Sequence, residues 1–69
     1  MDIVKGQRWV PTKGARTQDR TITGVYEWQG APWVGYIRHG KTERDDCKHS
    51  CRIGGFRAWI RRHNALVQP

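Results

Sequence analysis

The residues best suited to bind a ligand in this sequence are arginines in its C-terminal third. Arg57 and Arg61 are four residues apart, so on a helix they lie one turn from each other on the same side. A guanidinium pairs bidentately with a phosphate, and two of them at this spacing suit successive phosphates of a nucleic-acid strand. We therefore predict a cationic face that binds nucleic acid and contains the following residues: Arg52, Arg57, Arg61, Arg62, Lys13 and Arg16.

The net charge favours an anionic partner without choosing between kinds of partner. Thirteen Lys and Arg against six Asp and Glu give a formal net charge of +7 and an isoelectric point near 10.3. Arginines on a solvated helix are also common without any ligand, and an acidic protein from a host or a phage would be attracted by the same charge as a nucleic acid. A protein–protein interaction module is therefore the alternative function. The sequence leaves self-association open.

Aromatic residues alternate along the chain with the basic ones. Trp9, Phe56 and Trp59 are expected in the core, because the sequence offers few other large apolar side chains. Trp28 and Trp33 flank a predicted hairpin turn and are candidates for exposure to solvent. An exposed tryptophan beside an arginine can stack on a base of a single strand. We therefore add Trp28 and Trp33 to the candidate site as stacking residues.

The two cysteines, Cys47 and Cys51, lie in a polar segment with His49 between them. His39 or His63 could complete a tetrahedral zinc site, but structural zinc sites combine C-x₂-C or C-x₄-C spacing with a second ligand pair, which this chain lacks. The sequence leaves three states open for this pair: zinc ligands, a reversible disulfide, or free thiols in a loop. We expect free thiols, with no bound metal and no cofactor.

Nothing in the sequence predicts a catalytic residue. Asp45 and Asp46 are adjacent, so their side chains point apart, and the other four acidic residues are scattered. Ser50 is the only serine, and no nucleophile is placed with a base and an orienting acid. We therefore expect a protein that is not an enzyme.

Length and composition predict one small domain over residues 1–69. Two domains would each fall below the roughly 40 residues at which unaided cores fail. Only 36% of the 69 residues are hydrophobic, so the aromatic side chains must supply much of the buried area. The N-terminus has no apolar run typical of a signal peptide, and no run is long enough for a membrane span. With only two cysteines, a cytoplasmic protein is expected.

The N-terminal half of the chain is dominated by β-prone segments. We predict strands at Gly6–Val10, Arg20–Trp28 and Trp33–Arg38, because β-branched and aromatic residues are concentrated there. Gly24 is expected to form a bulge, since the apolar residues change face at that point. A turn at Gln29–Pro32 joins the second and third strands into a hairpin, and residues 12–18 are expected to form a mobile basic loop.

In the C-terminal half, we expect a loop or a frayed strand at residues 42–49. Residues 50–53 are expected to form a short strand or a lead-in to a helix. Gly54 and Gly55 are expected to break regular structure. The spacing of Phe56, Trp59, Ile60 and His63 then predicts an amphipathic helix of about two turns. Asn64 ends this helix in a left-handed conformation, and residues 65–67 return as a last strand.

These elements predict a mainly β fold, a small curled antiparallel sheet with one short C-terminal helix. An SH3-like barrel is the first choice, and an open sheet with the helix packed on one face is the second.

Four short segments carry a resemblance to a known group of proteins. They are Gly6-Gln7-Arg8-Trp9, Arg20-Thr21-Ile22, Trp33-Val34-Gly35-Tyr36 and Phe56-Arg57-Ala58-Trp59-Ile60. In these segments the chain resembles small SH3-like barrel proteins of temperate phages and prophages. The resemblance implies the fold and a phage or prophage origin. It implies no activity, because most members of that group have no assigned role.

Overall fold

The computed structural model of the protein describes residues 3–14, 16–40 and 42–68. Along the chain the elements are β1 (Arg8–Val10), β2 (Arg20–Trp28), β3 (Ala31–Arg38), the 3₁₀ helix η1 (Glu43–Asp45), β4 (Cys47–Arg52), α1 (Ile53–His63) and β5 (Leu66–Val67). The five strands form one antiparallel sheet in the order β4-β3-β2-β1-β5. The predicted mainly β fold with a single short C-terminal helix is confirmed.

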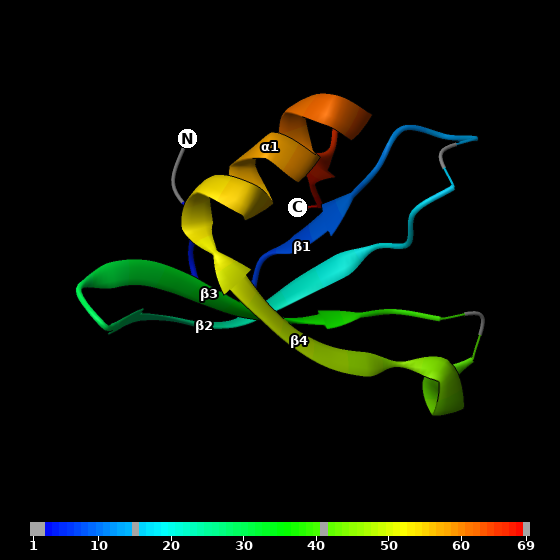
Figure 1. Ribbon diagram of the computed structural model, residues 1–69. Coiled ribbons are helices and arrows are strands. Elements are labelled where there is room, and N and C mark those ends of the chain that lie inside the picture. The colour runs from blue at the N-terminus through cyan, green and yellow to red at the C-terminus, as the bar shows by residue number, and fades with distance from the viewer. Residues whose placement is uncertain (1–2, 15, 41, 69) are drawn as a thin grey trace.

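The sheet is open, and α1 covers one of its faces (Figure 1). Strand β4 forms one edge and β5 the other, so the closed barrel that was the first choice does not form. The last strand returns to the start of the chain, because β5 pairs with β1 through Trp9 and Val67. The helix between β4 and β5 therefore spans the concave side of the sheet, as expected for the second choice.

The hairpin of β2 and β3 is the longest paired region of the sheet. The predicted boundaries of β2 are confirmed, and its register shifts between Ile22 and Gly24, where a bulge was expected. The turn is shorter than predicted, since it consists of Gln29 and Gly30 alone. Both residues have positive φ, 50° and 74°, which matches the twist of a two-residue hairpin.

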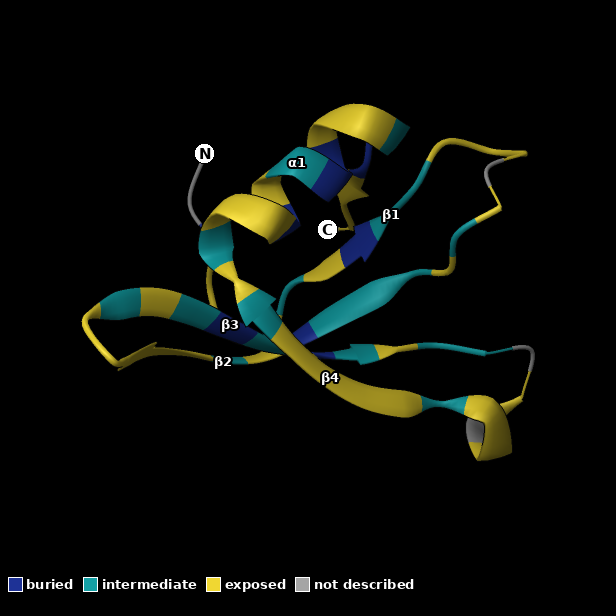
Figure 2. Ribbon diagram, viewed as in Figure 1, coloured by how far each residue is buried: buried dark blue, intermediate teal, exposed yellow. Residues whose placement is uncertain are grey.

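The core lies between the concave face of the sheet and the inner face of α1 (Figure 2). Its buried side chains come from every part of the chain: Ile3, Trp9, Ile22, Val34, Tyr36, Phe56, Trp59, Ile60 and Ala65. The prediction that Trp9, Phe56 and Trp59 form the core is confirmed. No polar or charged residue among those described is buried, so the fully buried side chains are all apolar.

Helix α1 begins three residues earlier than the sequence predicts. It starts at Ile53 and includes Gly54 and Gly55, so the prediction that these glycines break regular structure is wrong. They occupy the first turn, where backbone N–H groups have no partner within the helix and a glycine costs little packing. The predicted end is confirmed, because Asn64 adopts the left-handed conformation with φ 47°.

Strand β4 (Cys47–Arg52) confirms the strand alternatives for residues 42–49 and 50–53, so the two cysteines do not lie in a loop. Its register places Arg52 opposite Trp33, Cys51 opposite Val34 and Cys47 opposite Arg38. Most of its side chains are exposed, because it is an edge strand and its polar residues show no apolar alternation. Backbone pairing with β3 forms this strand, and that pairing leaves no pattern in the side chains.

Arg20 reaches into the space between sheet and helix. Its guanidinium carbon lies 4.2 Å from the ring centroid of Trp59, 4.6 Å from that of Tyr36 and 5.7 Å from that of Phe56. Burial lowers the pKa of Arg20. The charge is stabilised by the faces of aromatic rings rather than by a carboxylate.

The aromatic core yields a first prediction. Replacing Trp59 with alanine removes a side chain that is 7% exposed and that donates from Nε1 to the Thr17 hydroxyl at 3.0 Å. We expect a loss of about 3 to 5 kcal/mol in the free energy of unfolding, measured by urea denaturation. Trp28→Ala is the matched control, because Trp28 is 53% exposed and its removal costs about 1 kcal/mol or less. Equal losses in the two variants would contradict this assignment.

Candidate functional site

The outer side of α1 presents three of the predicted nucleic-acid-binding residues. Arg57, Arg61 and Arg62 are exposed, while Phe56, Trp59 and Ile60 on the inner side are buried. This division follows from the helical period of 3.6 residues, which rotates the arginines away from the apolar stripe. Arg61 and Arg62 lie in the last turn, where cations interact favourably with the helix dipole.

Arg52 connects this helix surface to the sheet. It is the last residue of β4 and also the N-cap of α1, and its side chain is exposed and makes no capping hydrogen bond. The first turn of α1 contains no acidic residue. The positive end of the helix dipole and the charge of Arg52 therefore both attract an anion to the N-terminus of α1.

The loop that carries Lys13 and Arg16 is held against the C-terminal end of α1. Both the backbone N–H and the hydroxyl of Thr12 donate to the carbonyl oxygen of His63, at 2.9 and 2.7 Å. On the other side of the two basic residues, the Thr17 hydroxyl accepts from Trp59 Nε1. Lys13 and Arg16 are exposed between these ties. The sequence did not predict these ties, because they join residues 42 and 51 positions apart.

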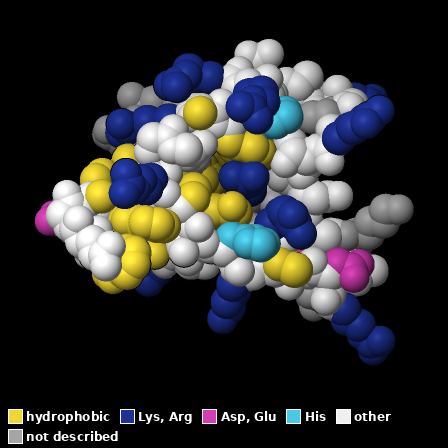
Figure 3. Space-filling view, viewed as in Figure 1, with side chains coloured by type: hydrophobic (Ala, Val, Ile, Leu, Met, Phe, Trp, Pro, Cys, Tyr) yellow, Lys and Arg dark blue, Asp and Glu magenta, His cyan; other side chains and the backbone are white. Residues whose placement is uncertain are grey.

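Carboxylates are kept apart from this cationic face. Among the side chains that the structure describes, the ion pairs are Arg8–Asp19 at 2.9 Å and His39–Asp46 at 3.2 Å, the second requiring a protonated imidazole. Neither involves an arginine of α1. Figure 3 shows Lys and Arg side chains over the helix, with acidic side chains at two edges of the view. The described residues of the cationic face are therefore not neutralised within the molecule.

The two candidate stacking residues lie together on the β2–β3 hairpin. Trp28 is exposed and Trp33 is half-buried, with ring centroids 5.4 Å apart and planes at 81°. With Tyr26 and Ser50 they line a recess of about 230 Å³. Tyr26 and Ser50 were not among the predicted site residues. Tyr26 is two residues before Trp28 on the same strand, so the strand period could have indicated it.

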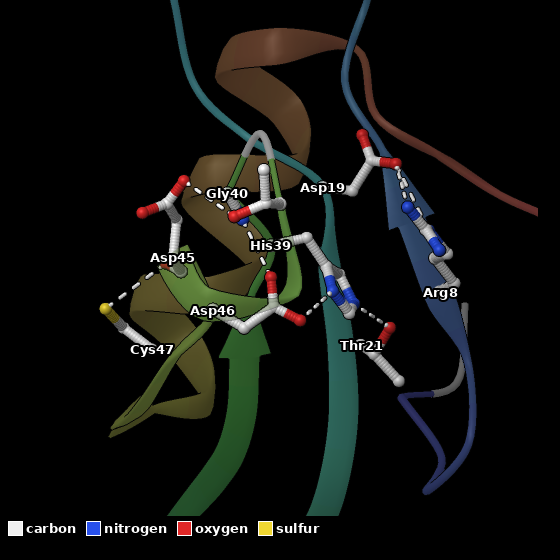
Figure 4. Close-up of polar contacts among 9 residues, drawn as sticks. Arg8, Asp19, Thr21, His39, Gly40, Asp45, Asp46 and Cys47 are labelled. Atoms are coloured by element: carbon white, nitrogen blue, oxygen red, sulfur yellow. Dashed lines mark hydrogen bonds and ion pairs between the residues drawn. The ribbon is translucent and has the colours of Figure 1, made fainter.

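A separate polar network lies at the other end of the sheet (Figure 4). The hydroxyl of Thr21 is 2.6 Å from Nε2 of His39, and Nδ1 of His39 is 3.2 Å from the carboxylate of Asp46. Asp46 also accepts from the backbone N–H of Gly40 at 2.9 Å. This last hydrogen bond is the main reason that the pKa of Asp46 lies below its ordinary value of 3.8.

The order hydroxyl, imidazole and carboxylate resembles that of a catalytic triad. Here the carboxylate closes the turn between β3 and β4, because the same Asp46 side chain binds the turn backbone and the imidazole. A Cβ at residue 40 would overlap with Asp45, so the turn requires glycine at Gly40. We interpret the network as a structural tie that fastens η1 and the start of β4 to β2.

The two cysteines are free thiols in a strand rather than in a loop. Four residues of strand separate their Cα atoms by about 13 Å, whereas a disulfide requires less than about 7 Å. A disulfide between Cys47 and Cys51 is therefore excluded. Among the described residues, no group of three or more His, Cys, Asp and Glu is arranged to hold a metal ion.

Comparisons with protein-family models, with curated proteins and with solved structures found no match to the chain. Within the described part of the chain, no helix combines the length and the apolar character needed to cross a bilayer. The function is therefore inferred from the residues of the chain itself.

The thiols give a second prediction. Cys51 is half-buried, and burial raises the pKa of its thiol, while Cys47 is exposed. Because the thiolate is the reactive form, Cys47 should react with a thiol reagent at pH 8 about tenfold faster than Cys51. The rates are measured separately in Cys51→Ser and Cys47→Ser variants. If the two thiols react at equal rates in the folded protein, the difference in burial is contradicted. If the rates become equal only after unfolding in urea, the difference in burial is supported.

The Asp46 tie gives a third prediction, on pH. A carboxyl whose pKa is lowered by folding stabilises the fold above its ordinary pKa and loses that contribution as the pH falls through the lowered value. Wild-type Tm should therefore fall below pH 3.8 more steeply than the Tm of Asp46→Asn. At pH 7 the variant should melt at a lower temperature. Parallel Tm curves for the two proteins across this range would show that the carboxylate does not hold the turn.

Proposed function

We propose that this protein binds nucleic acid without acting on it chemically, through the cationic face formed by Arg52, the outer side of α1 and the loop around residues 13–16. The observation that carries the proposal is the segregation of charge. Arg52, Arg57, Arg61 and Arg62 are exposed and have no ion-pair partner among the described side chains, whereas Asp19 and Asp46 are engaged elsewhere.

The spacing of these cations supports phosphate contacts. Arg57 and Arg61 are separated along the helix by about 6 Å, since each residue rises about 1.5 Å. Guanidinium groups at this spacing can each pair with a different phosphate of one strand. The ties from Thr12 and Thr17 to α1 keep the loop that carries Lys13 and Arg16 beside the last turn. The face thus extends past the end of the helix.

Repulsion within the cationic face also supports a polyanionic ligand. Like charges on one small surface repel each other and lower stability. A bound polyanion relieves that repulsion, and its binding is favoured by the release of its counterions. The phage or prophage origin and the absence of catalysis stay predictions from the sequence. An acidic protein as partner is an outcome that the following experiment can reveal.

The cationic face gives a fourth prediction. The double variant Arg57→Gln, Arg61→Gln should retain the wild-type fold and bind a labelled oligonucleotide more weakly. Each lost phosphate contact removes about 0.9 from the slope of log affinity against log salt on a duplex and about 0.7 on a single strand, so the slope should decrease by about 1.8 or about 1.4. Fluorescence anisotropy at several salt concentrations measures both quantities.

The matched control removes the same charge from the opposite end of the molecule. Arg38 and Arg44 are exposed near η1, which lies far from α1 (Figure 1). The variant Arg38→Gln, Arg44→Gln should keep a salt slope close to that of the wild type. If both double variants weaken binding equally, only net charge matters and α1 is not the contact surface. If no oligonucleotide binds but an acidic protein does, the alternative function replaces this one.

A further inference from the structure

The aromatic recess on the β2–β3 hairpin is not required by the core. Val34 and Tyr36 of β3 point to the concave face and are buried. Trp33, between them in the sequence, therefore lies on the opposite, outer face of the sheet. The register places Tyr26 directly across from Trp33, and Trp28 is two residues further along the same strand. All three rings thus share the outer face, away from α1.

Leaving these rings in solvent has a cost for so small a protein. Tyr26 is 45% exposed and Trp28 is 53% exposed, although the chain has only seven aromatic residues with which to build a core. Exposed apolar surface of this kind is typical of a binding site. The recess that they form with Ser50, about 230 Å³, has room for one planar ring.

The walls of the recess are suited to a flat, polar ligand. Trp28 and Trp33 meet edge to face, which leaves aromatic faces available for stacking. The Ser50 hydroxyl adds a group that can donate or accept. A nucleobase offers both a π-face for the rings and ring nitrogen or carbonyl acceptors for the Ser50 hydroxyl.

The charge around the recess selects among ligands with flat rings. Arg52 lies directly opposite Trp33 in the register, and Lys48 is on the same outer face of β4. Glu27 is on the other face of the hairpin, since it pairs with Pro32. An aromatic recess bordered by cations disfavours an ammonium ligand and favours a ring attached to an anion.

We propose that the recess of Tyr26, Trp28, Trp33 and Ser50 takes one unpaired nucleobase while Arg52 contacts the adjoining phosphate, so that the protein prefers single strands to duplexes. This inference rests on the proposed function and specifies its substrate. A base within a duplex has both faces covered by its neighbours, whereas a base of a single strand can enter the recess. Arg52 leads from the recess to Arg57 and Arg61, which continue the phosphate contacts along α1.

The test compares three labelled probes by fluorescence anisotropy: an oligothymidine strand, an abasic strand with the same number of phosphates, and a duplex of the same length. Wild-type protein should bind the oligothymidine strand about tenfold more tightly than the abasic strand, because stacking on aromatic rings contributes on that scale per base. It should also bind the oligothymidine strand more tightly than the duplex.

Variants assign the preference to the recess. Trp28→Ala should bind the oligothymidine strand about tenfold more weakly and leave the affinity for the abasic strand and its salt slope unchanged. Trp28→Phe keeps a stacking ring and should recover most of the preference. Leu66→Ala is the control, because Leu66 is 74% exposed but lies on β5 at the opposite edge of the sheet. Circular dichroism of each variant confirms that the fold is retained.

The outcomes separate the two proposals. If oligothymidine and abasic strands bind equally and Trp28→Ala changes neither affinity, the recess does not take a base, while the cationic face remains the nucleic-acid-binding surface. If the duplex binds as tightly as the oligothymidine strand, the preference for single strands is wrong. If none of the three probes binds, this inference and the proposed function are both overturned.

Discussion

The guanidinium of Arg20 is the point at which the sheet and the helix meet. Arg20 comes from β2, Tyr36 from β3, and Phe56 and Trp59 from α1, and the charge lies against the rings of all three aromatic residues. The rings also contact one another, with centroids 5.4 Å apart for Tyr36 and Phe56 and 5.5 Å apart for Phe56 and Trp59. A chain with few aliphatic residues thus joins its two layers by aromatic stacking around a cation. This contact and the burial of Phe56, Trp59 and Ile60 together place α1 on the sheet, and the position of α1 sets the direction in which its arginines point.

The same arrangement determines which surfaces are left for binding. Because α1 covers the concave face, the outer face of the sheet remains open, and the hairpin extends beyond the area that the helix covers (Figures 1 and 2). Aromatic residues on the concave side form the core, and those on the outer side form the recess. Basic residues follow a similar division, since Arg20 is enclosed by rings while Arg57 and Arg61 face solvent. The sheet thus separates the aromatic residues of the core from those of the recess. The helix separates the enclosed Arg20 from the exposed arginines Arg57 and Arg61.

The parts of the fold that were predictable from the sequence are those with a local pattern. The β-branched and aromatic run of β2, the bulge before Gly24 and the helix end at Asn64 all follow from the residues concerned. Strand β4 was only one of two alternatives for its residues, because its pairing with β3 is made by the backbone and its polar side chains do not alternate. The exposure of the helix arginines followed from periodicity, whereas the inclusion of Ser50 in the recess and the ties from Thr12 and Thr17 depend on contacts between distant segments. Such contacts are set by tertiary packing and leave no mark on the local sequence.

Strand β4 passes into α1 without any intervening residue, because Arg52 ends the strand and Ile53 begins the helix. A junction of this kind has no loop that could act as a hinge, and both of its sides are fixed, one by the ladder with β3 and the other by the packing of Phe56. The junction therefore limits how far the distance between the hairpin recess, which Arg52 borders, and the arginines of α1 can change. A flexible strand that occupied both the recess and the arginines of α1 would have to span that distance. Strands too short to reach would gain only one of the two contacts. Affinity would therefore depend on strand length and would rise in a step once the span is reached.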